Sequence, residues 1–327
     1  MHILVTGAAG MVGRKLIERL ARDGSLAGEA VSRVTAADVA APDLPGAPSF
    51  PVTVAVGDLA APGEAERLVA GRPEMIFHLA AIVSGEAEAA FDKGYHVNLD
   101  GTRRLFEAVR GVGDGYRPRL VFASSIAVFG APFPEVIGDE FLAAPQTSYG
   151  TQKAICELLL DDHARRGFLD GIGLRLPTIC VRPGRPNRAA SGFFSAIIRE
   201  PLNGEEAVLP VADDVVHWHA SPRAAVGFLV HAAGLDLTRL GHRRSLTMPG
   251  VAVSVAEQIE ALRRVAGERV AARIRREPDP VIARIVAGWP RRFEARRARE
   301  LGFRAEAGFE EIIRIHVEDE LGERWVG

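Results

Sequence analysis

Lysine, tyrosine and cysteine are scarce in this chain of 327 residues. Only three of its 40 basic side chains are lysines, and it contains three tyrosines and two cysteines. Cys156 and Cys180 lie far apart and lack CxxC spacing, so the sequence supports neither a disulfide framework nor a zinc site. We expect both to be reduced, buried, small apolar residues.

Long apolar runs and a strong net charge are also lacking. No stretch approaches the roughly 20 apolar residues that span a bilayer, and the N-terminal MHILVTGAAG has no cationic, signal-like start. A formal net charge of -2 gives no field that would attract nucleic acid or an anionic membrane. The arginine-rich stretch from Trp289 to Leu301 also contains glutamates and an apolar stripe, which predicts a solvated helix. We therefore expect a cytoplasmic protein without nucleic-acid or membrane partners.

The first half of the chain alternates short apolar segments with longer helical patterns, which is typical of βαβ units. The predicted strands cover residues 2–6, 33–37, 52–56, 75–79, 120–123 and 172–176. The predicted helices cover residues 12–22, 63–70, 95–112 and 149–166. The fold class is therefore predicted to be α/β, with a doubly wound parallel (Rossmann) sheet.

The regular alternation of predicted strands and helices ends at Pro177, and beyond it strands become few and loops longer. We expect residues 1–177 to form an NAD-binding domain to which some later segments return. Residues 178–327 are expected to form mainly a smaller, mixed substrate lobe. Because ligands bind at the carboxyl ends of the strands in doubly wound sheets, this lobe would bind the substrate.

The segment TGAAGMVG places three glycines directly after the first predicted strand and at the start of a helix. Gly7 permits a tight turn, Gly10 lets the backbone approach a pyrophosphate, and Gly13 lets the helix pack closely on the sheet. This context, a strand before and an amphipathic helix after, is the one that the dinucleotide-binding motif requires.

Two carboxylates follow later strands. Asp38 ends the second large strand, where it can accept both ribose hydroxyls of NAD and repel a 2'-phosphate; the alternative is that it only caps a turn. Asp58 could bind the adenine amino group, or it could cap the helix that begins near Pro62. His78 ends the fourth strand and is interpreted as a hydrogen-bonded structural residue. These positions favour NAD over NADP.

Tyr149 and Lys153, in SYGTQK, lie one helical turn apart and therefore share a face. A free tyrosine titrates near 10, and a nearby ammonium stabilises the phenolate. With three tyrosines and three lysines, a chance YxxxK has a probability of about 0.03. Upstream, Ser124 and Ser125 stand at the end of the fifth predicted strand. Ser125 is better placed to hold the reacting oxygen while Tyr149 moves the proton, and Ser124 is the alternative.

The segments TGAAGMVG, HLAA, VNLDGT, SSIAVFG and SYGTQK resemble, in this order and spacing, the extended short-chain dehydrogenase/reductase family. The closing ARRARELGFRAEAGFEEII also resembles that family, so the similarity covers nearly the whole chain. The resemblance implies an NAD-dependent enzyme that commonly forms homodimers through the helices beginning near Asn98 and Tyr149. On the cofactor side it implies contacts from Met11, Val12, Leu59, Leu79, Ala80, Ala81, Asn98, Leu176, Pro177 and Thr178.

Many members of that family act on nucleotide sugars, which require arginines or lysines that grip a pyrophosphate. Two departures count against such a substrate. After HLAA, where sugar-nucleotide epimerases often have a lysine, this chain has Ser84 and Gly85. Before the late helix, where those epimerases often have an arginine-aspartate pair, this chain has DDVVHWHASPR. A small carboxylate-bearing substrate suits these residues better, with Ser84 binding a hydroxyl.

The loop VRPGRPNR offers Arg182, Arg185 and Arg188 as clamps for a carboxylate, although a solvated loop is equally consistent with it. His217 and His219 are further candidates for polar contacts. The segments from Ser124 to Leu160 and from Gly171 to Leu202 resemble the D-erythronate-oxidising subfamily. That similarity implies oxidation of the C2 hydroxyl of a four-carbon sugar acid to the 2-oxo acid.

Two further functions stay open beside the epimerase. An L-threonine dehydrogenase would need an ammonium pocket, for which the loop shows no clear residues. A non-enzymatic NAD(P) sensor would be expected to lose the serine, tyrosine or lysine, and all three are present here.

Overall fold

The computed structural model describes residues 1–43, 46, 48–184 and 190–322. The chain divides into two compact units. Unit 1 comprises residues 1–128, 145–176 and 226–247, and unit 2 comprises residues 129–144, 177–225 and 248–327. The chain passes from unit 1 to unit 2 between residues 176 and 177. Two segments depart from a simple division at that point: residues 129–144 belong to unit 2, and residues 226–247 belong to unit 1.

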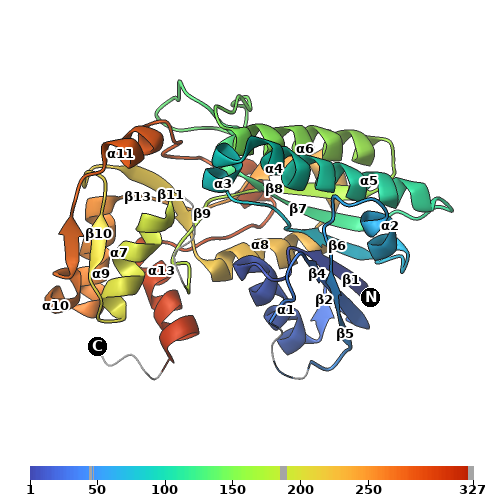
Figure 1. Cartoon of the computed structure of the whole chain (residues 1–327), viewed down its shortest axis with the longest axis horizontal. Coiled ribbons are helices and arrows are strands. Elements are labelled where there is room, and N and C mark those ends of the chain that lie inside the picture. The colour runs from blue at the N-terminus through green and yellow to red at the C-terminus, as the bar shows by residue number, and fades with distance from the viewer. Residues whose placement is uncertain (44–45, 47, 185–189, 323–327) are drawn as a thin grey trace. The chain divides into compact units, whose positions relative to one another are not determined.

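Unit 1 is built on a seven-stranded, fully parallel sheet with the order β12-β8-β7-β6-β1-β4-β5 (Figure 1). The strands are β1 (His2–Thr6), β4 (Arg33–Asp38), β5 (Val52–Val56), β6 (Met75–His78), β7 (Arg119–Ser125), β8 (Asp170–Leu176) and β12 (Ser245–Thr247). The six predicted strands are confirmed to within two residues at each end. The strand order reverses beside β1, which is where doubly wound sheets bind ligands.

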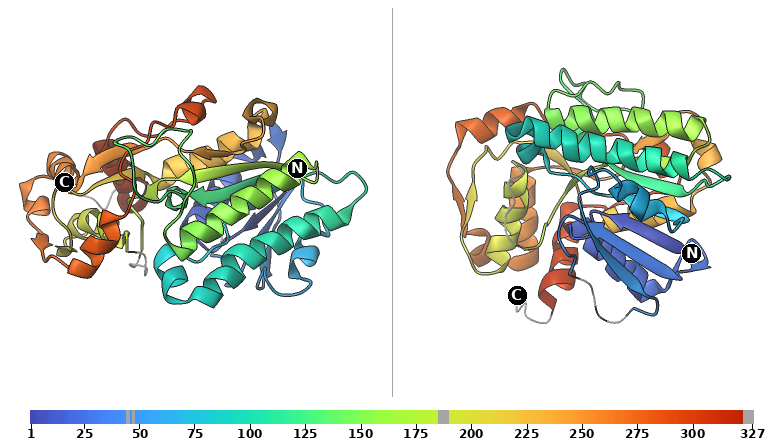
Figure 2. Two further views of the ribbon diagram at one scale, coloured as in Figure 1. Left: turned by 90° about the horizontal axis from the view of Figure 1, so that it is seen from above. Right: turned by 45° about the vertical axis from the view of Figure 1, so that its right-hand side comes forward.

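Helices cover both faces of this sheet (Figures 1 and 2). Unit 1 contains α1 (Met11–Asp23), α2 (Glu64–Val69), α3 (Ser84–Ala89), α4 (Phe91–Gly94), a π-helical turn (Tyr95–Asp100), α5 (Gly101–Val112), a 3-10 turn (Ile126–Val128), α6 (Ser148–Arg165), most of α8 (Pro222–Gly234) and a second 3-10 turn (Leu237–Leu240). A short hairpin joins β2 (Ser25–Leu26) and β3 (Glu29–Ala30). Leu4, Ile76 and Phe122 pack on one face with residues from α2, α5 and α6. Because neighbouring strand residues point to opposite faces, Ile3 and Phe77 are buried on the other.

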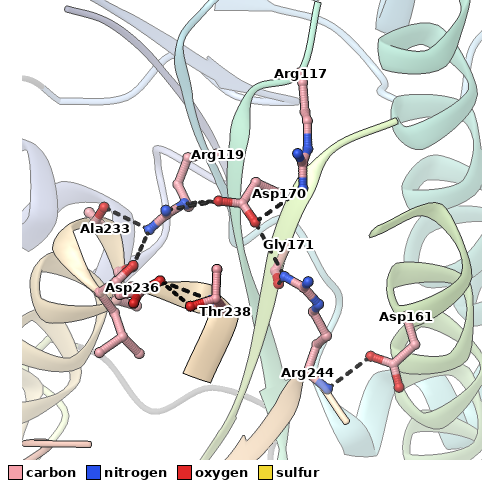
Figure 3. A network of polar contacts seen from close by, with 11 residues as sticks. Arg117, Arg119, Asp161, Asp170, Gly171, Ala233, Asp236, Thr238 and Arg244 are labelled. Atoms are coloured by element: carbon pink, nitrogen blue, oxygen red, sulfur yellow. Dashed lines mark hydrogen bonds and ion pairs between the residues drawn. The ribbon is translucent and has the colours of Figure 1, made fainter. Parts of the chain in front are cut away.

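Strand β12 was not predicted, because its three residues are too few to show a period. A network of charged side chains joins its neighbourhood to the sheet (Figure 3). Asp170, which begins β8, forms ion pairs with Arg119 (2.8 Å) and with Arg244 (3.2 Å), which precedes β12. Arg119 Nη1 also donates to three carbonyls at the end of α8, and the Arg244 N–H donates to Asp161 on α6 (3.2 Å). Residues 226–247 are therefore held to β7, β8 and α6 by hydrogen bonds and ion pairs.

Unit 2 contains a three-stranded sheet, β13-β11-β9, and a two-stranded one, β10-β14. The strands are β9 (Thr178–Ile179), β10 (Ala207–Leu209), β11 (Val216–Ala220), β13 (Val251–Ser254) and β14 (Ile274–Arg276). The helices are α7 (Gly192–Leu202), the first turn of α8, α9 (Val255–Ala266), α10 (Glu268–Ala271), α11 (Pro280–Ala287), α12 (Arg296–Glu300), α13 (Phe309–His316) and a π-helical turn (Val317–Leu321). This mixed composition agrees with the fold class expected for the second half.

The prediction of a helix across the arginine-rich stretch is wrong. Only Arg296–Glu300 is helical there. Phe293 is buried and forms an isolated β-bridge with Ile137, and residues 290–292 have no regular secondary structure. Within the described ranges, none of the helices is both long enough and apolar enough to cross a membrane.

Candidate cofactor and catalytic site

The glycine loop between β1 and α1 leaves no room for a side chain at Gly7 or Gly13. Gly7 has a φ of +76°, and a Cβ there would lie 2.6 Å from the Ala80 nitrogen, at the end of β6. A Cβ on Gly13 would lie 2.2 Å from the Gly7 carbonyl oxygen, and one on Gly10 would lie 3.2 Å from the same oxygen. The loop therefore brings bare backbone to the start of α1, the geometry that a dinucleotide pyrophosphate needs.

Asp38 ends β4 beside this loop. Its Oδ2 accepts a hydrogen bond from the Ala9 N–H (2.9 Å), and Oδ1 accepts a longer one from the Ala40 N–H (3.4 Å). The carboxylate thus lies against the glycine loop, where the adenosine ribose of a dinucleotide is expected. Both glycine loop and carboxylate fit NAD, and the negative charge disfavours a 2'-phosphate.

Asp58, which follows β5, is held by two partners. Its Oδ1 accepts from the Ala60 N–H (2.9 Å), and Oδ2 lies 3.0 Å from His96 Nε2. Its pKa is lowered: burial acts to raise it, but the hydrogen bonds from His96 and Ala60 outweigh that effect. The alternative that Asp58 caps the following helix is wrong, because the N-cap of α2 is Gly63 and has no side-chain cap bond. An adenine contact at this carboxylate stays a prediction.

His78, at the end of β6, is a structural residue as expected. Its Nδ1 lies 2.7 Å from the Thr6 hydroxyl and its Nε2 lies 2.8 Å from the Thr102 hydroxyl, while its ring stacks on Phe122. Burial and the nearby Lys153 lower its pKa to about 3. The imidazole is therefore neutral across the physiological range.

Asn98 lies in the π-helical turn, a feature often found at functional sites. Its Oδ1 accepts from the Ile82 N–H (2.8 Å), and its Nδ2 donates to Gln152 Oε1 (2.7 Å). Asn98 therefore ties the loop after β6 to helix α6.

Helix α6 begins at the Thr147 N-cap, whose hydroxyl accepts from the Gly150 N–H (3.1 Å). Lys153 is 2% exposed; its Nζ donates to the Ala123 carbonyl (2.8 Å) and lies 5.8 Å from the centroid of the Tyr149 ring. Burial lowers the pKa of Lys153 to about 8, against opposing effects of Cys156 and Glu157. The two residues predicted to manage the proton thus lie together.

The two consecutive serines at the end of β7 have different surroundings. Ser124 is buried and donates to Glu157 Oε1 (2.5 Å), which also binds Arg175. Ser125 is half-buried, and its hydroxyl accepts from the Ala127 N–H (3.1 Å). Because adjacent strand residues point to opposite faces, only one of the two can face a substrate, and this arrangement favours Ser125.

The other predicted positions are spread over both units. In unit 1, Met11 and Val12 form the first turn of α1, Leu59 follows Asp58, Ser84 and Gly85 begin α3, and Leu176 ends β8. Ala81 and Pro177 lie in the irregular segments after β6 and β8. Cys156 and Cys180 are free thiols and fully buried, as expected.

In unit 2, the guanidinium of Arg182 donates to the Ile179 carbonyl (3.0 Å) and to the Ser191 hydroxyl (2.9 Å). His217 is 3% exposed; its Nε2 lies 2.7 Å from the Thr178 hydroxyl and its Nδ1 lies 3.1 Å from the Pro290 carbonyl oxygen. Burial lowers its pKa to about 4. Arg185 and Arg188 lie outside the described residues.

Sequence reasoning missed Glu157. It lies four residues after Lys153, so its place on the same helix face could have been read from KAICE. Its burial could not, because an isolated helical glutamate is usually solvated and its partner Arg175 lies on another element.

Comparisons with known proteins agree with this arrangement. The family described as "NAD dependent epimerase/dehydratase family" matches residues 3–219. A protein named D-erythronate dehydrogenase from Cupriavidus necator is 48% identical over 323 residues, covering 98% of each chain. One of the same name from Haemophilus influenzae is 39% identical, covering 98% of this chain and 100% of its own. A crystal structure named as that of a nucleoside-diphosphate-sugar epimerase from Agrobacterium tumefaciens is 65% identical, with a TM-score of 0.96, and covers 98% of this chain and 95% of its own.

Proposed function

We propose a specific reaction for this chain, which belongs to the NAD-dependent epimerase/dehydratase family: oxidation of the C2 hydroxyl of a small sugar acid such as D-erythronate to the 2-oxo acid. The observation that carries the proposal is the placement of Lys153 between Tyr149 and the end of β7. The glycine loop, Asp38 and this pair all belong to unit 1, whose sheet edge suits a dinucleotide.

Each residue has a distinct role in the proposed reaction. Tyr149 acts as general base and takes the proton of the C2 hydroxyl, Ser125 holds that hydroxyl, and Lys153 stabilises the phenolate. Bound NAD would supply the acceptor for the hydride that leaves C2. Lys153 would also tether the cofactor ribose. The substrate carboxylate is assigned to an arginine of the segment 182–188, and its remaining hydroxyls to residues such as Ser84.

A nucleotide-sugar epimerase is the second candidate, favoured by the name given to the 65% identical protein from Agrobacterium tumefaciens. The sequence argues against it where a pyrophosphate would be gripped, because Ser84 and Gly85 replace a lysine. Two full-length relatives named for the sugar acid favour the dehydrogenase.

A substrate panel separates the two. The purified protein is incubated with NAD and, in turn, D-erythronate, its C2 epimer, L-threonine or UDP-galactose, while NADH absorbance is followed and UDP-sugars are separated by chromatography. We expect NADH with D-erythronate and no epimerised UDP-sugar. Epimerised UDP-sugar without sugar-acid oxidation would refute the proposed reaction.

The same panel identifies the carboxylate-binding arginine. Arg182→Gln, Arg185→Gln and Arg188→Gln are compared, and the residue that binds the carboxylate is expected to raise KM by at least about tenfold while kcat changes less. Arg182 has partners within unit 2, so its variant also needs a melting curve as a stability control.

We further propose that the protein is a cytoplasmic homodimer that associates through α5 and α6. Leu158 on α6 is 70% exposed, which suits a contact with a second copy. Two free thiols suit a reducing compartment. Light scattering of the wild type should give twice the mass of the chain, and Leu158→Glu should shift it toward the monomer, whereas Leu142→Glu, at a similarly exposed leucine, should not. A monomeric wild type would refute the dimer.

A further inference from the structure

A buried carboxylate with no assigned role follows Lys153 by one helical turn. Glu157 lies on α6 and is 4% exposed. Lys153, Glu157 and Asp161 follow one another at intervals of four residues and therefore share one face of the helix. Burying a carboxylate is unfavourable unless hydrogen bonds and opposite charges compensate it.

Glu157 is compensated by residues of two neighbouring strands. Its Oε1 accepts from the Ser124 hydroxyl (2.5 Å) and from Arg175 Nε (3.0 Å), and its Oε2 accepts from Arg175 Nη2 (2.7 Å). Ser124 and Arg175 are paired across β7 and β8, and the next pair in this register is Ser125 with Leu176. Glu157 thus joins α6 to the strand ends that carry the proposed substrate and cofactor contacts.

The groups that act on Lys153 differ in charge. His78 on β6 is neutral because burial lowers its pKa to about 3. Cys156 on α6 is a buried thiol with a raised pKa and is therefore also neutral near pH 7. Tyr149 precedes Lys153 by one turn. Cys156 and Glu157 oppose the loss of the Lys153 ammonium that burial favours, and of these two Glu157 is the carboxylate, ion-paired with Arg175 (2.7 Å).

We propose that Glu157 is a positioning residue for the reaction proposed above: it holds the buried Lys153 as an ammonium and locks α6 to the ends of β7 and β8. Once the Tyr149–Lys153 pair has lost one proton, the remaining proton resides on either the phenol or the amine. Only the phenolate–ammonium form can accept the substrate proton. Glu157 is one turn from the amine and two turns from the phenol, so its charge favours that form.

The scarcity of lysine makes this directly measurable. The chain contains only Lys15, Lys93 and Lys153, so protein carrying 13C at the lysine ε-carbon gives three side-chain signals. Lys93→Arg and Lys15→Arg variants assign two of them. The titration of Lys153 is then followed on the NAD-saturated protein without substrate, across pH 6 to 11.

Three variants test the proposal. Glu157→Gln should move the Lys153 titration to lower pH by about one unit, because it removes the charge and leaves Arg175. Arg175→Gln, which leaves the carboxylate bound to Ser124, should move it to higher pH. Asp161→Asn, one turn further along the same face, should shift it by less than about 0.3 unit. Equal shifts for Glu157→Gln and Asp161→Asn, or no shift for Glu157→Gln, would overturn the proposal. Should Glu157→Gln not fold, a downward or absent shift in Arg175→Gln would overturn it instead.

Kinetics provide the second measurement. Glu157→Gln should lower kcat by about tenfold across the pH range while KM changes less than about twofold, and Glu157→Asp, which keeps the charge, should recover part of the loss. Asp161→Asn should retain wild-type kcat. An equal loss of kcat in Glu157→Gln and Glu157→Asp would mean that Glu157 has a structural role only. Because the NMR titration needs no substrate, it tests whether Glu157 stabilises the Lys153 ammonium even if D-erythronate is not oxidised.

Discussion

Unit 1 and unit 2 both place polar side chains that resemble catalytic groups, but the two settings differ. In unit 1, Ser125 and Tyr149 are half-buried, so part of each side chain can meet a ligand. In unit 2, His217 is 3% exposed, is bonded at both ring nitrogens, and stacks on Phe194 with ring centroids 5.2 Å apart. Residue type alone suggested a substrate contact for His217. The comparison teaches that accessibility and hydrogen-bond saturation separate a core histidine from a reactive one.

The largest effect that would sharpen this comparison is expected at Tyr149. Tyr149→Phe removes the proposed general base and should lower kcat about a thousandfold, equivalent to about 4 kcal/mol of barrier. NAD affinity, measured by fluorescence titration, should change little because the ring remains. A variant that keeps more than about a tenth of the wild-type kcat would place the base elsewhere.

His217→Phe should affect stability rather than turnover. The substitution keeps the ring that stacks on Phe194 but leaves the Thr178 hydroxyl and the Pro290 carbonyl without their partner. Each loss costs about 1–3 kcal/mol, so urea denaturation should show a decrease of about 2–6 kcal/mol. The exposed His242→Ala serves as control and should stay within about 0.5 kcal/mol. A tenfold fall in the kcat of folded His217→Phe would instead indicate that His217 contacts the substrate, as the sequence predicted.

The pH dependence of stability offers a test that involves one histidine from each unit. The pKa values of His78 and His217 are lowered to about 3 and about 4, mainly by burial. Between pH 6.5 and 4 the unfolded chain therefore binds protons that the native state excludes, so stability falls as the pH falls, by about 1.4 kcal/mol per unit for each histidine. His217→Phe should reduce that slope, as measured by urea denaturation at pH 7, 6 and 5. An unchanged slope would mean that His217 is protonated in the native state.

The smallest effect is expected at Asp161 in unit 1. Burial raises its pKa to about 6, so at higher pH the ionised carboxylate is less stable in the native state than in the unfolded chain. Asp161→Asn should still accept from the Arg244 N–H and should raise the free energy of unfolding at pH 8 by about 0.5–1 kcal/mol, a small gain because solvent screens this half-buried side chain. The gain should shrink as the pH falls below 6 and disappear below about pH 4, where the carboxyl is protonated in the unfolded chain as well. A destabilised variant at pH 8 would show that the ionised Asp161 is stabilising.

Six strands of the unit 1 sheet and the helices α1, α2, α5 and α6 could be predicted from the sequence because strand burial patterns, helix caps and glycines act over a few residues. The β2–β3 hairpin, α3, α4 and α8 were not predicted. Asp38 and the glycine loop meet because both follow parallel strands, and such ends share one edge of a sheet. Strand β12 escaped prediction because SLT carries no pattern and its position depends on Asp170 and Arg244, far apart in the sequence.

The choice between Ser124 and Ser125 illustrates what sequence reasoning could not decide. Both serines lie at the end of the same strand, and the difference between them depends on Glu157, 33 residues from Ser124. Likewise, nothing in VHWHA reveals that His217 meets the Pro290 carbonyl, 73 residues away. Long-range partners, rather than local preferences, separate structural from reactive residues here.

The position of β12 along the chain has a consequence for biosynthesis. This edge strand, Ser245–Thr247, joins a sheet whose other six strands end by Leu176. During translation the ribosome therefore releases the first six strands with the edge of β8 still unpaired, and it must then synthesise residues 177–244 before β12, which covers that edge, emerges. A nascent chain interrupted after Leu176 would expose a parallel edge to pairing with other chains, so premature termination there favours aggregation over a small, independently folded product.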